Sequence, residues 1–395
     1  MIFDKSRFDT VDLIPAVRIP ARLVRKLLQH DLSESFLYSR AGVKTVHAAS
    51  ENSKEYRVVL LRDKFPSDLV EEFQAVETDF ELRSGYESLS TEEALRRLLP
   101  DCGDPPSSFE TIGHIAHMNL RDEFLPHKAL IGQVILDKNP HIETVITKIG
   151  SLSNEFRTFE KEIIASREGN HSLVASVSEN KMRLTVDYDN CYWNSRLSFE
   201  RARLLKSFTS THPSKSRLID MCCGVGALAC FAAREGLEVF ANDLNASAVF
   251  CARENASKNK VDLESFNTDG RDFVRDLVKT GKLKEPKFNH VMINLPEIGL
   301  GFLDVFRGLF NSETDLGGNI FQVYCHCFSR EDPPEDARFR ALSALGLSQD
   351  SNLEISLVHV RDVSPNKVMY SVELRVPEEV LVVESMSGSK KVRLD

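Results

Sequence analysis

Short apolar runs and stretches of helical spacing alternate along the C-terminal half of the chain. One apolar run ends at Asp220 and is followed by a glycine turn and an alanine-rich helical stretch over 227–235, and a second run covers 238–243. A helix is then expected over 246–260 and a further strand over 288–296. Strands that alternate with helices in this way form a doubly wound, mostly parallel sheet, so the pattern predicts an α/β fold here.

The remaining segments mix strands and helices less regularly. The pattern predicts a strand over 54–65, a helix over 91–100 that stops before a proline, an apolar helix over 127–138 and a β-branched strand over 142–150. Residues 355–377 indicate two strands around a Ser-Pro-Asn turn, which favours an antiparallel hairpin at the edge of the sheet.

A turn-rich segment, 102–109, is the first candidate linker in the chain. It separates a small docking domain at 1–105 from a middle α+β domain at 106–188, which precedes the α/β domain at 189–395. A length of 395 residues agrees with two or three domains.

Composition and charge narrow the class of protein. The chain has 42% hydrophobic and 28% charged residues, which excludes collagen-like and wholly disordered classes. No apolar run reaches the ~18 residues of a membrane span, so we expect no membrane partner. With 50 basic against 59 acidic residues the net charge is −9, so any nucleic acid must bind a local basic surface.

The eight cysteines show no spacing typical of a disulfide scaffold or a zinc ribbon, which favours an intracellular, reducing environment. Cys325, His326 and Cys327 are the one cluster with metal-ligating side chains. They belong either to a zinc site or to a buried strand with reduced thiols, and the lack of further ligands nearby favours the strand. His114 and His117 are expected to form hydrogen bonds, and we expect no metal.

The glycine turn satisfies the fingerprint G-x-G-x-x-A with Gly224, Gly226 and Ala229, which alone is compatible with a dinucleotide. A pyrophosphate would lie against the helix N-terminus, where the carboxylate of Asp220 would repel it. A cationic ligand without phosphates, such as S-adenosylmethionine, fits the same turn. Asp243, at the tip of the next strand, is suited to accept hydrogen bonds from both ribose hydroxyls. The alternative is that both aspartates cap helices.

The strand over 288–296 ends in Asn294-Leu295-Pro296. Ligands bind at the carboxyl ends of strands in such sheets, so this segment is expected to border the acceptor pocket. Proline fixes φ, and the asparagine amide supplies a donor and an acceptor that suit the edge of a planar heterocycle. This ending points to methylation of nitrogen, and the alternative is a tight loop with a capping asparagine.

Several longer motifs occur in one order along the chain. They are HIAHMNLRDEFLPHKALIGQVILDKNPHIETVITK, NEFRTFEKE, YWNSRLSFERAR, the glycine turn, NDLN and NLP. In this order the chain resembles the archaeal and eukaryotic tRNA (guanine-37-N1)-methyltransferases over roughly residues 110–390. The resemblance implies a class I, Rossmann-like methyltransferase domain after two smaller α+β domains, with the first domain docking on the outer corner of tRNA. It also implies S-adenosyl-L-methionine as cofactor, tRNA as partner and a monomeric protein.

The resemblance also assigns residues to roles. Arg157 matches the arginine that holds guanine O6, and Glu200 matches the proposed general base. Asn294 and Pro296 match the catalytic nucleobase pocket. The surrounding substrate-binding positions are matched by Tyr192, Arg196 and Arg201. The expected cofactor-binding residues are Asp220, Gly224, Gly226, Asp243, Leu244, Asp269, Gly270 and Asn294.

The chemistry of guanine N1 calls for such a pair of side chains. N1 carries a proton at neutral pH, so a carboxylate must remove it before N1 can attack the sulfonium methyl, which typically contributes about 10²–10⁴-fold. Negative charge then spreads onto O6, where a guanidinium stabilises it. The base must also leave its stack, which costs less for a loop nucleotide than for a paired one.

Alternatives remain for individual residues and for the function. Glu200 and Arg201 can form a surface ion pair at a helix start, and Trp193 can stack on a base or pack in the core. The sequence departs from the family's usual residues at Cys222, Cys223, Ala227, Leu228, Gly299 and Gly301. The alternative functions are methylation of a nitrogen in another RNA or in a protein, and a catalytically idle tRNA-binding homologue. We expect a cytoplasmic protein, and the family resemblance extends this to the nucleus and the mitochondrial matrix.

Overall fold

The structure is a computed structural model of the chain. It describes residues 3–40, 42–50, 54–100, 103–149, 160–167, 169, 171–210, 215–330, 334–364 and 366–383. The chain packs into two compact units. The first consists of Met1–Glu110, Ala116–Lys148 and Glu162–His171, and the second of Thr111–Ile115, Ile149–Lys161 and Ser172–Asp395. The three-part division at about residues 105 and 188 stays a prediction.

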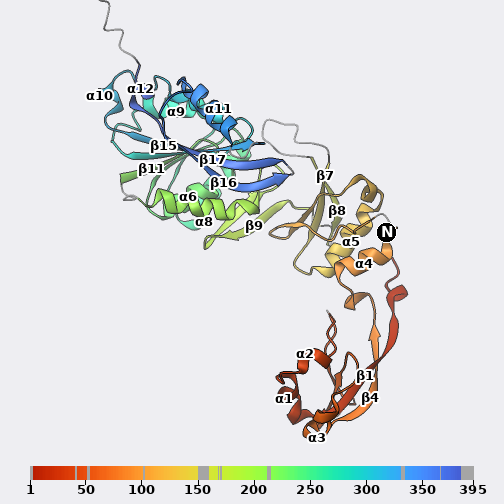
Figure 1. The fold of residues 1–395 in the computed structure, drawn as a ribbon. Coiled ribbons are helices and arrows are strands. Elements are labelled where there is room, and N and C mark those ends of the chain that lie inside the picture. Colours follow the sequence, from red (N-terminus) through yellow and green to blue (C-terminus); the bar gives the residue numbers. More distant parts are fainter. Residues whose placement is uncertain are drawn as a thin grey trace, which may run out of the picture. The chain divides into compact units, whose positions relative to one another are not determined.

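A seven-stranded sheet forms the centre of the second unit (Figure 1). Its strands are β11 (Ser216–Asp220), β12 (Glu238–Asn242), β13 (Glu264–Phe266), β14 (Phe288–Ile293), β15 (Ile320–Ser329), β16 (Ile355–Ser364) and β17 (Lys367–Arg375). They lie in the order β13-β12-β11-β14-β15-β17-β16. The first five strands in this order are parallel, whereas β17 runs antiparallel to both β15 and β16. The predicted doubly wound sheet and its edge hairpin are therefore confirmed.

Helices cover both faces of this sheet (Figure 1). They are α6 (Ser198–Phe208), α7 (Ala227–Arg234), α8 (Ala246–Asn259), α9 (Gly270–Lys279), α10 (Glu313–Leu316), α11 (Glu335–Leu345) and α12 (Glu378–Leu381), with the 3-10 helices η6 (Ser195–Leu197) and η8 (Gly299–Phe306). Alternate strand residues pack on opposite faces: Leu218 and Val239 lie in the core beneath α6 and α7, and Ile219 and Phe240 in the core beneath α9 and α11. Burial on both faces explains the nearly continuous apolar runs of these strands.

A hairpin of β9 (Val174–Glu179) and β10 (Met182–Asp187) is fixed to α8 by two asparagines. The Asn255 side chain accepts a hydrogen bond from the Thr185 backbone N at 2.7 Å and donates to the Thr185 carbonyl at 2.9 Å. Asn259, one helical turn further on, bonds the Arg183 backbone in the same two-way manner. The amides thus pair with the strand as another strand would.

The first eight strands of the chain form two smaller sheets. One has the order β2-β3-β1-β4 and is antiparallel, and the other has the order β5-β6-β7-β8. The strands are β1 (Thr10–Pro20), β2 (Val46–Ala48), β3 (Tyr56–Leu60), β4 (Val76–Ser84), β5 (Glu110–Ile112), β6 (Ile115–Met118), β7 (Thr144–Ile149) and β8 (Glu160–Ser166). The helices are α1 (Val24–Leu28), α2 (Ser33–Phe36), α3 (Val70–Phe73), α4 (Thr91–Leu98) and α5 (Lys128–Lys138). The four elements predicted in this part are present, although the strand expected over 54–65 ends at Leu60.

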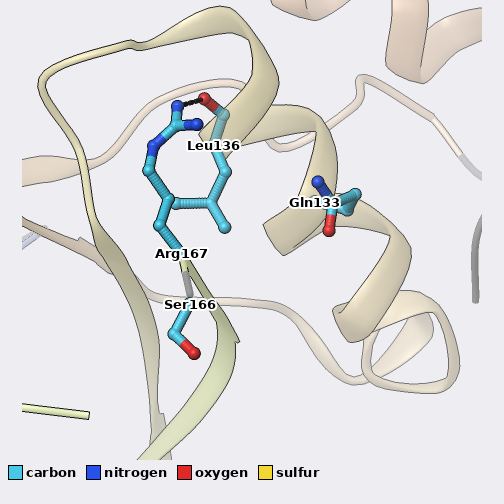
Figure 2. Close-up of a pocket in the computed structure, with 4 residues that line it drawn as sticks. All are labelled: Gln133, Leu136, Ser166 and Arg167. Atoms are coloured by element: carbon cyan, nitrogen blue, oxygen red, sulfur yellow. Dashed lines mark hydrogen bonds between the residues drawn. The ribbon is translucent and has the colours of Figure 1, made fainter. Parts of the chain in front are cut away.

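Arg167 closes the C-terminal end of α5. Its guanidinium donates to the carbonyl of Leu136, in the last turn of α5, and at 2.8 Å to that of Ile142, which follows the helix. Arg167 and Leu136 also line a shallow pocket of about 280 Å³ with Gln133 and Ser166 (Figure 2). The guanidinium that lines this pocket is thus already bound by backbone carbonyls.

Within the described residues, no helix combines the length and the apolar character needed to cross a bilayer.

Candidate active site at the carboxyl ends of the strands

The glycine turn after β11 is tied to the end of β12 by Asp243. One carboxylate oxygen of Asp243 accepts a hydrogen bond from the Gly224 backbone N at 2.8 Å, and the other accepts from the Asn245 backbone N at 2.9 Å. Asp220, the last residue of β11, is 3% exposed and accepts from the Cys222 backbone N at 3.3 Å. The residues that cap α7 and α8 are Gly226 and Asn245, so the alternative of helix capping by the two aspartates is wrong.

Two glycines of this turn have left-handed backbone conformations for different reasons. Gly226 has φ +77°, and a Cβ there would lie 2.7 Å from the Ala252 side chain on α8. Gly224 has φ +55°, and a Cβ there would meet nothing within 4 Å. Gly226 therefore permits close helix packing, whereas Gly224 borders open space beside Asp243.

Burial raises the pKa of both aspartates at this turn. Burial, with a contribution from the charge of Asp243, raises the pKa of Asp220 to about 7, although the Cys222 backbone hydrogen bond opposes it. Burial also raises the pKa of Asp243, against the hydrogen bonds from Asn245 and Gly224. A cation placed between the glycine turn and these carboxyl groups would favour their ionised forms and so oppose the effect of burial.

The other residues expected at the cofactor site lie at neighbouring strand ends. Asp269 caps α9 through a 2.8 Å hydrogen bond from the Arg271 backbone N, and Gly270 is the first residue of that helix. Leu244 follows Asp243 directly, and its side chain is exposed. The structure thus gathers these residues around the ends of β11, β12 and β13, at the side of the sheet where such folds bind ligands.

Glu200 lies in the first turn of α6 and is 6% exposed. Its carboxylate accepts hydrogen bonds from Nε and Nη2 of Arg203 at 2.7 and 2.8 Å, and Nε2 of His326 lies 2.9 Å from its Oε1. Burial disfavours the charged form, but the hydrogen bonds from Arg203 and His326 outweigh it and lower the pKa of Glu200 to about 2. Arg203 also bonds Glu373 at 2.6 Å, so its charge has a second partner.

His326 connects Glu200 to the strand end that was predicted to border the acceptor pocket. Its Nδ1 lies 2.8 Å from Oδ1 of Asn294, which follows β14 directly. Asn294 also donates its backbone N to Sγ of Cys222 at 2.8 Å, next to the glycine turn. Pro296 is buried, and its carbonyl accepts from the Phe328 backbone N at 2.9 Å. From the sequence, His326 is a candidate only for a metal site, together with Cys325 and Cys327, and no role at the acceptor pocket is predicted for it.

The alternation of β15 separates the thiols of the Cys-His-Cys segment from its imidazole. Cys325 and Cys327 lie in the core beneath α9 and α11, whereas the His326 ring contacts Glu200 of α6. All three residues are buried, and both thiols are free. The buried-strand interpretation is therefore confirmed. In the part of the chain that the structure describes, no group of three or more His, Cys, Asp and Glu side chains could hold a metal ion.

The charged residues beside Glu200 pair differently from the sequence alternative. Arg201 binds the carboxylate of Glu179 on β9 with two hydrogen bonds, at 2.7 and 2.6 Å, and its guanidinium lies 4.8 Å from the ring centroid of Trp193. An ion pair between Glu200 and Arg201 is thus wrong, and the buried Trp193 packs in the interior. If Arg201 binds the substrate as predicted, it does so while its guanidinium is paired with Glu179.

The remaining predicted substrate residues have exposed side chains. Tyr192 precedes η6 and Arg196 lies within it, just before α6, and the Tyr192 hydroxyl accepts a hydrogen bond from the Asn194 side chain at 3.2 Å. Both side chains are therefore available to a ligand. Arg157, the predicted partner of guanine O6, lies outside the described residues, so its role stays a prediction.

Comparison with known proteins shows the family to which the chain belongs. The TRM5/TYW2 methyltransferase domain matches residues 175–314, and the TYW2 N-terminal domain matches residues 91–171. A protein of Danio rerio named tRNA (guanine(37)-N(1))-methyltransferase is 37% identical, with 96% of this chain and 82% of the relative covered. A Phytophthora infestans protein of the same name is 36% identical over 99% of this chain and 96% of the relative. The chain belongs to the tRNA (guanine(37)-N(1))-methyltransferase family.

A solved structure of this family has the same fold. The crystal structure of Trm5b from Pyrococcus abyssi superposes with a TM-score of 0.64 at 21% identity, covering 92% of this chain and 99% of that one. The class I methyltransferase fold with additional N-terminal elements, implied by the resemblance, is thus confirmed.

Two departures from the usual residues of this methyltransferase family have local explanations. Cys222 supplies the sulfur that accepts the Asn294 backbone N–H, and so links the glycine turn to the acceptor-side strand end. Gly299, in η8, lies against β15: a Cβ there would be 3.1 Å from Sγ of Cys325 and 3.2 Å from the His326 carbonyl. Cys222 and Gly299 thus each lie at a contact between elements that form the site.

Proposed function

We propose that the chain transfers a methyl group from S-adenosyl-L-methionine to N1 of guanosine 37 in the anticodon loop of tRNA. The observation that carries this proposal is a buried carboxylate, Glu200, linked through one imidazole to the Asn294 strand end. Removal of the N1 proton requires such a proton acceptor beside the nucleobase pocket, which supports the proposal. The family's near full-length match supports the same activity.

The donor is held at the glycine turn. Asp243 accepts hydrogen bonds from the ribose hydroxyls, and Gly224 leaves room for close approach of the ligand. The carboxylate of Asp220 supplies negative charge for the cationic methionine part of the donor. Asp269, Gly270 and the exposed Leu244 line the adjacent strand ends. With S-adenosylmethionine bound there, the sulfonium methyl is the electrophile.

Glu200 accepts the proton of guanine N1, and N1 then attacks the methyl group as the carbon–sulfur bond breaks. A carboxylate with a pKa of about 2 is a weak base while Arg203 and His326 both bind it. As the proton arrives and Glu200 becomes neutral, Arg203 keeps its ion pair with Glu373, so this partly buried cation is not left without a partner. Arg157 stabilises the charge that develops on O6.

The decisive test is transfer of tritiated methyl groups from S-adenosylmethionine to unmodified tRNA with guanosine at position 37. We expect incorporation that disappears when this base is changed to adenosine. Equal incorporation into the adenosine variant would assign the enzyme to another nitrogen. Absence of donor binding in calorimetry, with tRNA binding retained, would identify an idle tRNA-binding homologue.

Donor affinity is expected to rise between about pH 6 and about pH 8, because a cationic donor favours ionised Asp220. The pKa of Asp220 is raised to about 7, so below that pH the donor must displace a proton. Affinity should then fall by up to about tenfold per pH unit, and above it the affinity should level off. Calorimetric titrations at several pH values measure this.

Two comparisons make the pH test specific. Asp220→Asn should bind more weakly with a flat profile. S-adenosylhomocysteine, which lacks the sulfonium charge, should show a shallower slope than the donor. A flat wild-type profile, or an Asp220→Asn profile with the wild-type slope, would contradict the assignment of Asp220.

A further inference from the structure

His326 is a buried histidine that has a polar partner at each ring nitrogen. It is 2% exposed, with Nε2 at 2.9 Å from Oε1 of Glu200 and Nδ1 at 2.8 Å from Oδ1 of Asn294. These partners come from α6 and from the end of β14, whereas the ring belongs to β15. One side chain therefore joins the expected proton acceptor to the expected nucleobase pocket.

The chemistry of its partners fixes how the His326 ring bonds. An ionised carboxylate can only accept hydrogen bonds, so Nε2 carries a proton and donates to Glu200. The Asn294 amide has one oxygen and one nitrogen, and the end that faces Nδ1 determines which end is left for a ligand. Oδ1 of Asn294 faces Nδ1, and since an amide oxygen can only accept, this contact is a hydrogen bond when Nδ1 also carries a proton. With Nδ1 unprotonated the amide nitrogen must face the ring instead, so the proton on Nδ1 decides which end of the amide is left for the pocket.

The other side of the Glu200 carboxylate is equally constrained. Arg203 binds both carboxylate oxygens and also donates a hydrogen bond to Glu373 of β17. Glu373 in turn accepts a 3.0 Å hydrogen bond from the Ser371 hydroxyl. The carboxylate thus lies between a guanidinium and an imidazole, each on a different element. Loss of the His326 contact would leave it free to turn about the Arg203 side.

A second buried histidine in this sheet packs among aromatic rings. His290, on β14, is 1% exposed and packs between the rings of Phe208, Phe288 and Tyr324. Burial lowers its pKa to about 4, and its Nδ1 lies 3.3 Å from the Tyr324 hydroxyl. No hydrogen bond connects it to Glu200 or Asn294 in the described part of the chain, so it is a matched control.

We propose that His326 is a positioning residue for methyl transfer. It holds the Glu200 carboxylate and the Asn294 amide at a fixed separation and sets which end of that amide faces the nucleobase. The inference rests on the proposed function, and it deepens that function because His326 acts through Glu200 and Asn294 without touching the reacting atoms.

Three substitutions separate the two contacts of His326. In His326→Gln the amide nitrogen can reach the place of Nε2 and still donate to Glu200. In His326→Asn the shorter amide can reach only the place of Nδ1, next to Asn294. His326→Phe keeps a ring of similar size and removes both hydrogen bonds. His290→Gln serves as the control for loss of a buried histidine.

The expected result is a selective loss of kcat. His326→Phe should lower kcat by about 10²-fold, the cost of a base misplaced by about 1 Å, while KM for tRNA and Kd for the donor change by less than about threefold. His326→Gln should recover most of the rate and His326→Asn little of it. His290→Gln should lower the melting temperature with kcat nearly unchanged. Near wild-type kcat in His326→Phe, or equal losses in the Gln and Asn variants, would overturn the proposal.

A spectroscopic readout keeps this test separate from the proposed function. In protein labelled with ¹⁵N-histidine, the Nε2 signal of His326, assigned by its absence in His326→Gln, should move in Glu200→Gln, whereas the His290 signals should not. An unmoved signal refutes the contact whatever base is methylated. If the wild-type enzyme methylates a base other than guanosine 37, the proposed function fails, and the same kcat series on that base decides the role of His326.

Discussion

Replacement of Glu200 by glutamine is expected to lower kcat for methylation of guanosine 37 by about 10²–10⁴-fold. Glutamine keeps the size of the side chain and can still accept a hydrogen bond from Arg203, but it cannot take the N1 proton. Arg203 retains Glu373, so removal of the Glu200 charge does not leave this partly buried cation unpaired. Single-turnover kinetics with saturating donor measure the loss, and calorimetry should show donor affinity close to wild type.

Glu238→Gln is the matched control for this substitution. Glu238 also accepts from a buried arginine, Arg217, at 2.7 Å, but it is the first residue of β12 and so lies at the opposite end of the strand from Asp243. It should reduce the melting temperature without changing kcat. A Glu200→Gln enzyme with kcat within about threefold of wild type, and with its donor bound, would exclude Glu200 as the base.

The elements around the site could be predicted because their strands are buried on both faces. Ile219 and Leu218 face different cores, so the run before Asp220 is apolar throughout, and glycines mark its end. The position of Asp220 and Asp243 follows from this pattern, since the carboxyl ends of adjacent parallel strands meet at one edge of the sheet.

The partners of the charged residues could not be predicted in the same way. Glu200 and Arg201 are adjacent in sequence but project from different sides of α6, towards His326 and Glu179 respectively. Both partners come from strands distant in sequence, and no local pattern specifies that pairing. The strand period could have indicated that His326 faces away from Cys325 and Cys327, but not that it would meet a carboxylate.

Alanine at Gly226 is expected to destabilise the protein far more than alanine at Gly224. Both positions have positive φ, which costs a residue with a side chain about 1–3 kcal/mol. At Gly226 the new methyl group would also lie 2.7 Å from the Ala252 side chain, and such overpacking typically adds about 1–3 kcal/mol. The total is a large part of a typical stability of about 5–15 kcal/mol. Thermal and urea unfolding measure the difference.

Affinity for the donor should show the opposite order, with the larger loss in Gly224→Ala. The methyl group of Gly224→Ala enters open space beside Asp243, where we place the donor, so its affinity for S-adenosylmethionine should fall although the protein stays folded. Ala252→Gly should partly restore the stability of Gly226→Ala, because it removes the atom that the new methyl group meets, and a double-mutant cycle isolates this coupling. It should do nothing for Gly224→Ala. Equal stabilities of the two alanine variants, or the absence of rescue by Ala252→Gly, would show that the turn is not built on this helix contact.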